Sequence, residues 1–164
     1  MKLAIFGLGK MGGNMARRLR RAGIEVVGYN RSHDIVDQLA KEEGVIPAAS
    51  VEDAIKKLSA PRVVWLMLPA GAATEGMIEH LTPMLSKGDV IVDGGNSNYH
   101  DSQCRGVRLS ERGIGYVDVG TSGGVWGLAN GYCLMAGGEK STLEIITPAL
   151  KALAPAPDRG WAHV

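Results

Sequence analysis

The sequence predicts an α/β fold with a doubly wound, mainly parallel sheet and helices on both of its faces. Short apolar runs alternate with helix-like stretches along most of the 164 residues. The apolar runs are rich in Val and Ile without polar alternation, which is typical of parallel strands buried on both faces. Glycines follow the helix-like stretches and act as stop signals. In such folds, ligands bind beyond the carboxyl ends of the strands.

The expected elements follow each other in strand–helix order. The apolar runs predict strands over Lys2–Phe6, Glu25–Tyr29, Arg62–Leu68, Asp89–Val92 and Ile114–Val119. Apolar residues three and four apart predict helices over Met11–Arg21, Ile35–Glu42, Thr74–Leu85 and Ser102–Arg112. Further on, we expect a strand over Tyr132–Ala136 and a helix that begins at Ser141, with Glu144 as its capping-box partner. The closing stretch APAPDRGWAHV is interpreted as a proline-broken loop.

Composition limits the classes of partner. The length fits one domain, and a net charge of +1 gives no basic face for nucleic acid. No apolar stretch reaches the roughly 18 residues of a membrane span, and no signal peptide is visible, so we expect no membrane partner and a cytoplasmic protein. Cys104 and Cys133 are interpreted as buried or half-buried free thiols. The four histidines have no ligand spacing, and we expect no metal site.

The first motif is a glycine-rich turn directly after the first expected strand. In IFGLGKMGG, the residues Gly7, Gly9 and Gly12 form G-x-G-x-x-G at the opening of a helix. The first glycine allows a tight turn, the second lets a pyrophosphate approach the backbone, and the third lets the helix lie close to the sheet. We therefore expect the loop, with Leu8, Lys10 and Met11 between its glycines, to bind a dinucleotide in a Rossmann-like fold.

The end of the second strand indicates which dinucleotide binds. A carboxylate at Asn30 would bind the ribose hydroxyls of NAD, but the residue is neutral, and Arg31 and Ser32 can donate to a 2′-phosphate. This pattern favours NADP, with NAD as the other possibility and an ordinary solvated arginine as the alternative interpretation of Arg31. The missing carboxylate also argues against a methyltransferase that uses S-adenosylmethionine. The basic run Arg17, Arg18, Arg20 and Arg21 is interpreted as a solvated helix end.

Two further loops follow later strands at the expected carboxyl edge. Asp93-Gly-Gly-Asn-Ser97 ends one apolar run, and Gly120-Thr-Ser-Gly-Gly124 ends the next. Each loop offers neutral side-chain donors and glycine amides, which suit a carboxylate or the hydroxyls of a polar substrate. For either loop alone, a glycine-rich turn with a capping side chain is an equally good interpretation.

Together, these stretches resemble 6-phosphogluconate dehydrogenases, the decarboxylating enzymes of gluconate metabolism and the pentose phosphate pathway, in their short bacterial branch. The resemblance rests on GLGKMG, YNRS, DGGNSNYHD and GTSGGVWGLANGYCLMAGG, and it covers the whole chain. The sequence departs from the family at Pro69, where many members have lysine, and at Val125 and Trp126, where many have acidic residues.

The resemblance implies roles for particular residues. Asn96, Ser122, Gly123 and Gly124 would contact the sugar-acid phosphate substrate, and Asn96 would also lie near the nicotinamide. Asn30, Arg31 and Ser32 would hold the adenosine phosphate end of the cofactor. The residues Leu68, Pro69 and Ala70 would line the cofactor cleft.

The resemblance also implies that residues 1–164 form the NAD(P)-binding domain alone, without the helical C-terminal domain of the family. We expect the catalytic base and acid beyond Val164, no activity from this chain by itself, and a homo-oligomeric full-length protein. Two alternatives remain open. One is a domain of a 3-hydroxyisobutyrate-type dehydrogenase, and the other is a non-catalytic NADP-binding or sensing module.

Overall fold

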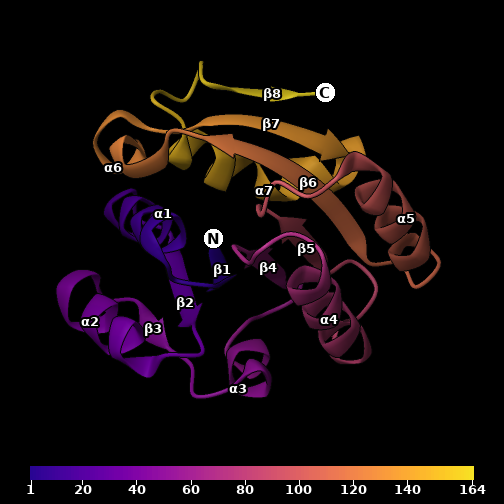
Figure 1. Ribbon diagram of the computed structural model, residues 1–164, viewed down its shortest axis with the longest axis horizontal. Helices are drawn as coiled ribbons and strands as arrows, with labels where there is room; N and C mark the ends of the chain where they lie inside the picture. Colours follow the sequence, from indigo (N-terminus) through magenta and orange to yellow (C-terminus); the bar gives the residue numbers. More distant parts are fainter.

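The computed structural model describes residues 1–164 and contains one eight-stranded sheet with the strand order β3-β2-β1-β4-β5-β6-β7-β8. All neighbouring strands are parallel except β6 and β7, which are antiparallel. The chain runs outward from β1 to β3, crosses back to β4 beside β1, and then continues to β8 at the other edge (Figure 1). The strand order therefore reverses between β1 and β4, where doubly wound sheets bind their ligands.

The strands are β1 (Lys2–Phe6), β2 (Glu25–Tyr29), β3 (Ile46–Pro47), β4 (Val63–Leu66), β5 (Val90–Asp93), β6 (Gly115–Ser122), β7 (Cys133–Gly138) and β8 (Trp161–His163). The α-helices are α1 (Lys10–Arg21), α2 (His33–Glu43), α3 (Val51–Lys56), α4 (Ala72–Leu81), α5 (Tyr99–Ser110), α6 (Gly127–Asn130) and α7 (Lys140–Leu153). Two short 3₁₀ helices are η1 (Thr82–Met84) and η2 (Gly124–Trp126).

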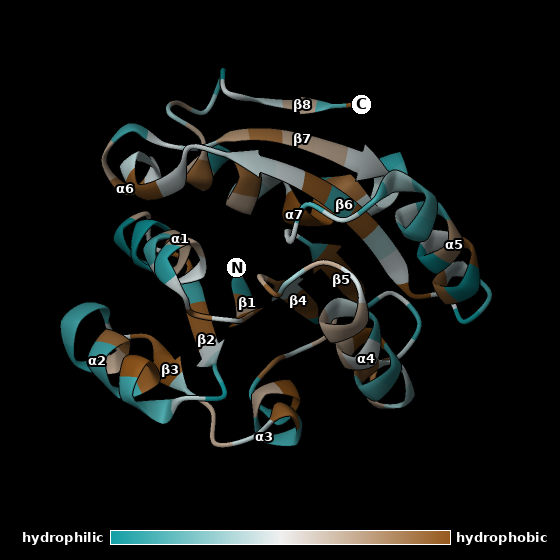
Figure 2. Ribbon diagram, viewed as in Figure 1, coloured by the Kyte–Doolittle hydropathy of each residue, from teal (hydrophilic) through white to brown (hydrophobic).

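The helices cover both faces of the sheet, as predicted. One buried apolar cluster lies between the sheet and α1, α2 and α7, and a second lies between the sheet and α3, α4 and α5. Alternate residues of each central strand enter opposite clusters; in β1, Ile5 enters the first and Phe6 the second. Apolar colour accordingly concentrates on the strands and polar colour on the helices (Figure 2). This two-sided burial explains why the strand sequences show no polar alternation.

Several element boundaries differ from the predictions. β6 continues to Ser122, so Thr121 and Ser122 belong to a strand and not to the predicted glycine turn. α7 begins at Lys140 after Glu139, with no side-chain cap, so the predicted capping box is wrong. The chain also forms β8 within the stretch predicted as loop, pairing with β7. These elements depend on long-range pairing, which local patterns do not report.

Two surface predictions are corrected. Cys104 and Cys133 are free, as predicted, but both are exposed. The basic run on α1 is only in part a solvated end: Arg21 is exposed, but Arg18 is half-buried and donates to carbonyl oxygens of Ala152, Leu153 and Ala154 at the end of α7. Its guanidinium thus neutralises the negative end of α7.

No helix is both long enough and apolar enough to cross a membrane. No group of three or more His, Cys, Asp or Glu side chains is arranged to hold a metal ion.

Candidate functional site

The glycine turn connects β1 to α1 at the reversal point of the sheet. Gly7 has φ 91°, and a Cβ there would overlap the carbonyl oxygen of Met67 after β4. A Cβ on Gly12 would overlap the carbonyl oxygen of Gly7. The first and third glycines are therefore needed for close packing of turn, helix and sheet.

Gly9 differs from the other two glycines of the motif. A Cβ on Gly9 would meet no atom within 4 Å, and the φ of −63° at Gly9 is one that any residue can adopt. Neither the packing nor the backbone of the protein therefore requires glycine at this position. Gly9 is the N-cap of α1, where no side chain caps the helix and no acidic residue occupies the first turn. The first-turn amides of a helix have no intrahelical acceptors. An open, uncapped helix start of this kind fits an anionic group such as a pyrophosphate.

The three residues after β2 have two different roles: Asn30 is hydrogen-bonded within the protein, whereas Arg31 and Ser32 are free donors. The Asn30 Oδ1 accepts from the Leu8 amide at 2.9 Å, and its Nδ2 donates to the Ser32 carbonyl at 3.1 Å. Asn30 therefore fixes the glycine loop against the end of β2. The exposed side chains of Arg31 and Ser32 make no hydrogen bond or ion pair, and the Ser32 hydroxyl does not cap α2. Both remain free to contact a ligand beside the glycine loop.

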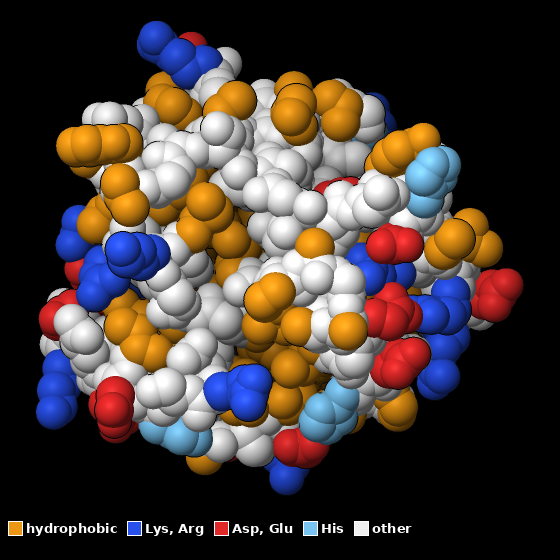
Figure 3. Space-filling model, in the orientation of Figure 1, with side chains coloured by type: hydrophobic (Ala, Val, Ile, Leu, Met, Phe, Trp, Pro, Cys, Tyr) orange, Lys and Arg blue, Asp and Glu red, His pale blue; other side chains and the backbone are white.

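The segment after β4 lies beside the glycine turn, because Gly7 packs against Met67. The two segments border one crevice at the carboxyl ends of the strands. Leu68 is half-buried, whereas Pro69 and Ala70 are exposed. The buried Thr74 hydroxyl in the first turn of α4 donates to the Pro69 carbonyl at 2.9 Å. On this face of the molecule, hydrophobic atoms lie between the regions of α1 and α4 with few charged side chains among them (Figure 3). The crevice thus has an apolar wall and a polar rim.

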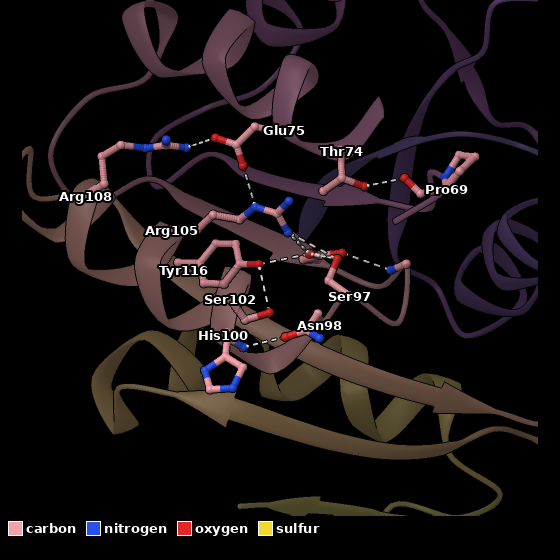
Figure 4. Close-up of polar contacts among 12 residues, drawn as sticks. Pro69, Thr74, Glu75, Ser97, Asn98, His100, Ser102, Arg105, Arg108 and Tyr116 are labelled. Carbon is pink, nitrogen blue, oxygen red and sulfur yellow. Dashed lines mark hydrogen bonds and ion pairs between the residues drawn. The ribbon is translucent and has the colours of Figure 1, made fainter. Parts of the chain in front are cut away.

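The loop after β5 is organised around a fully buried carboxylate. Asp93 accepts hydrogen bonds from the Gly95 amide at 3.0 Å, the Ser97 hydroxyl at 2.6 Å and the Tyr116 hydroxyl at 2.9 Å, and it pairs with Arg105 at 3.2 Å (Figure 4). Asp93 and Ser97 are therefore occupied within the protein. The polar groups of Asp93 and Ser97 therefore stabilise the conformation of the loop through internal hydrogen bonds.

Asn96 joins the β5 loop to β6. It has φ 55°, a left-handed conformation that asparagine tolerates. Its Oδ1 accepts from the Thr121 amide at 3.0 Å, and its Nδ2 lies 3.4 Å from the Thr121 carbonyl. This contact brings Asn96 close to Ser122, and the exposed Gly123 and Gly124 follow directly. The predicted substrate residues thus meet at one edge, with β1, β4 and β5 between them and the end of β2.

Sequence reasoning missed the side chains that support these loops. Arg105 on α5 is buried and lies between Asp93 and Glu75, which it contacts at 2.7 Å. Burial would raise the pKa of the Glu75 carboxyl, but hydrogen bonds from Arg105 and Arg108 hold it below its ordinary value. Burial raises the pKa of the Tyr116 hydroxyl, and the Asp93 charge adds to the rise. No local signal predicts these pairings, because the partners are up to 33 residues apart.

A well-defined pocket lies elsewhere on the molecule. It has a volume of about 840 Å³ and is enclosed by α5, β6 and the start of α7, with Gln103, Asp118 and Thr142 in its lining. None of the predicted site residues lines it. This pocket is not the better candidate, because the topological reversal, the open glycine and the free donors all lie at the carboxyl ends of β1, β2 and β4.

A doubly wound sheet with an uncapped glycine turn at its reversal point defines the class of protein as a dinucleotide-binding domain. The sequence profile described as the NAD binding domain of 6-phosphogluconate dehydrogenase matches residues 2–159. The chain belongs to this family of NAD(P)-binding oxidoreductase domains.

Individual relatives agree with this assignment. The chain is 39% identical over 155 residues to the NAD(+)-dependent, decarboxylating 6-phosphogluconate dehydrogenase of Bacillus subtilis, covering 93% of this chain and 33% of the relative. The chain thus spans about a third of the length of such curated relatives.

Solved structures show the same fold. The Plasmodium falciparum 6-phosphogluconate dehydrogenase, studied in its apo form and with NADP+ or 6-phosphogluconate, superposes with a TM-score of 0.91 and 28% identity over 100% of this chain and 37% of its own. A 3-hydroxyisobutyrate dehydrogenase of Mycobacterium tuberculosis superposes with a TM-score of 0.86 and 27% identity over 99% of this chain and 53% of its own.

Proposed function

We propose that residues 1–164 form the coenzyme-binding domain of an enzyme that oxidatively decarboxylates 6-phosphogluconate to ribulose 5-phosphate, with NADP as the preferred oxidant. The observation that carries the dinucleotide site is the open space above Gly9 at an uncapped helix start, beside the free side chains of Arg31 and Ser32. The family assignment supports the reaction class.

Each part of the crevice has a role in this proposal. The amides at the start of α1 bind the pyrophosphate, and Lys10 and Met11, in the first turn of α1, line the same side of the crevice. Arg31 and Ser32 bind the 2′-phosphate, while Asn30 acts indirectly by holding Leu8 in place. Leu68, Pro69 and Ala70 line the path toward the nicotinamide. When bound, the cofactor accepts a hydride from the 3-hydroxyl carbon of the substrate.

The sugar acid binds at the opposite end of the crevice. Asn96 and the Ser122–Gly124 segment lie together there, because Asn96 is paired with the backbone of Thr121. Asn96 is exposed and its amide nitrogen has only a long contact to Thr121, so this nitrogen can still donate to a hydroxyl. These groups position the substrate; we assign the proton-transferring base and acid to residues outside this domain.

A 3-hydroxyisobutyrate-type dehydrogenase is the second candidate, and the superposition on the Mycobacterium tuberculosis enzyme favours it. The two candidates share the dinucleotide crevice and differ in substrate. The Asp93–Ser97 motif, which the resemblance associates with 6-phosphogluconate dehydrogenases, favours the first candidate.

Two titrations test the proposal. Calorimetry of the chain with NADPH and NADH measures the cofactor preference, and we expect tighter binding of NADPH. Equal affinities would remove the NADP assignment, and no binding of either would remove the coenzyme-binding role. Assays of the protein encoded by the complete gene with 6-phosphogluconate and with 3-hydroxyisobutyrate separate the two candidates, because only one should support cofactor reduction with release of carbon dioxide.

A further inference from the structure

Arg105 lies between two segments of the proposed site: the Leu68–Ala70 segment, which follows β4 and leads into α4, and the Asp93–Ser97 loop, which follows β5. Only 3% of its side chain is exposed, and its Nε contacts Glu75 at 2.7 Å while its Nη1 contacts Asp93 and the Ser97 hydroxyl, each at 3.2 Å. Figure 4 shows the guanidinium between these partners, with Glu75 on one side and the β5 loop on the other. A buried arginine that bridges two carboxylates fixes the distance between the elements that carry them.

Each partner of Arg105 continues directly into one loop. Glu75 lies in the first turn of α4, where its neighbour Thr74 holds the Pro69 carbonyl. Asp93 and Ser97 flank Asn96, which in turn holds Thr121. Hydrogen bonds and ion pairs, joined by short stretches of backbone, therefore connect the Leu68–Ala70 segment, through Arg105, to the Asn96 and Ser122–Gly124 segments.

The two loops also touch directly. A Cβ on Gly95 would overlap the Leu68 carbonyl oxygen, so the backbones approach without any side chain between them. Contact of this kind sets a minimum separation but exerts no pull. The Gly94 amide donates to the Leu66 carbonyl at 2.9 Å where β4 and β5 end, and the ionic contacts of Arg105 add attraction beyond that point.

We propose that Arg105 is a positioning residue that, together with Glu75, Asp93 and Ser97, sets the position of the nicotinamide-side loop relative to the substrate loop. We name these four residues the Arg105 clamp. The inference rests on the proposed function for the identity of the ligands. The clamp touches neither ligand; it acts through Pro69 and Asn96. Loss of the clamp should leave the adenosine end of the site unchanged, since Arg31 and Gly9 lie on other elements.

The test uses Glu75→Ala, because Glu75 is the partly exposed member of the clamp and touches no residue of the β5 loop. Arg108→Ala is the matched control, because Arg108 is the other, exposed partner of Glu75 and makes no contact with Asp93. Arg105→Met leaves Asp93 buried without its cation and can prevent folding. Arg105→Lys is therefore the second variant, since lysine keeps the charge but cannot bridge both carboxylates with one fork.

Amide hydrogen exchange measures how firmly the clamp holds the β5 loop, and it needs no ligand. The reporters are the Gly95 amide, which donates to Asp93, and the Thr121 amide, which donates to Asn96. In Glu75→Ala and Arg105→Lys, we expect both amides to exchange about 2- to 10-fold faster, as for loss of one hydrogen bond, with no change in Arg108→Ala. Unchanged exchange at both reporters in Glu75→Ala would overturn the clamp.

Binding then tests the effect on the site. In Glu75→Ala, we expect NADPH affinity to fall about 2- to 10-fold, again the loss equivalent to one hydrogen bond, while the affinity for 2′,5′-ADP stays unchanged. A parallel loss for both ligands, or no loss for either, would overturn the positioning role. If the unmodified chain binds neither ligand, the proposed function fails, and the exchange experiment still decides whether the clamp couples the loops.

Discussion

At the scale of single residues, the main finding is that polar side chains which look alike in the sequence have opposite uses. Asp93 and Ser97 bind other parts of the protein, whereas Arg31 and Ser32 have no partner within it. Asn30 belongs to the first group, because both ends of its amide are occupied by backbone. The sequence predicted where these residues lie, but burial and pairing decide which of them can contact a ligand.

Arg31 gives the residue-scale prediction. Replacing Arg31 with alanine should weaken NADPH binding roughly 10- to 150-fold, because a hydrogen bond between charged groups contributes about 1.5–3 kcal/mol. NADH, which lacks the 2′-phosphate, should bind nearly unchanged. Calorimetric titration measures both. Arg112→Ala removes an exposed arginine in the turn after α5 and serves as the control. Equal losses for both cofactors would show that Arg31 does not read the phosphate.

At the scale of elements, periodicity predicted the central strands and most helices well. Their patterns come from burial on both faces of one sheet, which every such segment shares. The short strands β3 and β8 escaped prediction because each is stabilised mainly by its neighbours: β8, for example, follows prolines and pairs only with β7. The short helix α3 was missed although a local signal exists, since the Ser50 hydroxyl caps it by accepting from the Asp53 amide. The extension of β6 through Ser122 has the same cause, since it pairs with β7 up to Cys133.

Arg18 tests how one element depends on another. Its guanidinium donates to three carbonyls at the end of α7 and also to Leu128 of α6. Arg18→Ala should lower the free energy of unfolding by about 1.5–3 kcal/mol, the range for hydrogen bonds from a charged group. Arg17→Ala should cost less than about 1 kcal/mol, because its partner Glu42 is exposed. Urea denaturation compares them; equal costs would contradict a structural role for Arg18.

At the scale of the whole molecule, we propose that the domain positions ligands and that the groups for proton transfer lie outside it. The fold class, the glycine turn and the grouping of Asn96 with Ser122–Gly124 could all be predicted from the sequence, because they depend on strand ends that local patterns locate. The Arg105 clamp could not, since it joins α4, β5 and α5 through side chains whose spacing carries no signal.

The corresponding prediction concerns turnover. A pure sample of residues 1–164 should show no 6-phosphogluconate-dependent reduction of NADP, because a missing general acid or base typically costs 10²–10⁴-fold each. The formation of NADPH is followed by its absorbance. Asn96→Ala is the control for any residual signal: activity in the unmodified chain that this variant abolishes would place the catalytic groups within these residues.

The central claim is that a dinucleotide occupies the space above Gly9, and one substitution tests it directly. A Cβ on Gly9 meets nothing in the protein, so Gly9→Ala should leave the melting temperature nearly unchanged, whereas Gly12→Ala overlaps the Gly7 carbonyl and should destabilise the fold by about 1–3 kcal/mol. The decisive measurement is calorimetric titration of NADPH into Gly9→Ala. We expect affinity to fall by at least about tenfold, a loss of roughly 1.4 kcal/mol, because the methyl group fills the pyrophosphate position. Unchanged affinity in the folded variant would contradict the account.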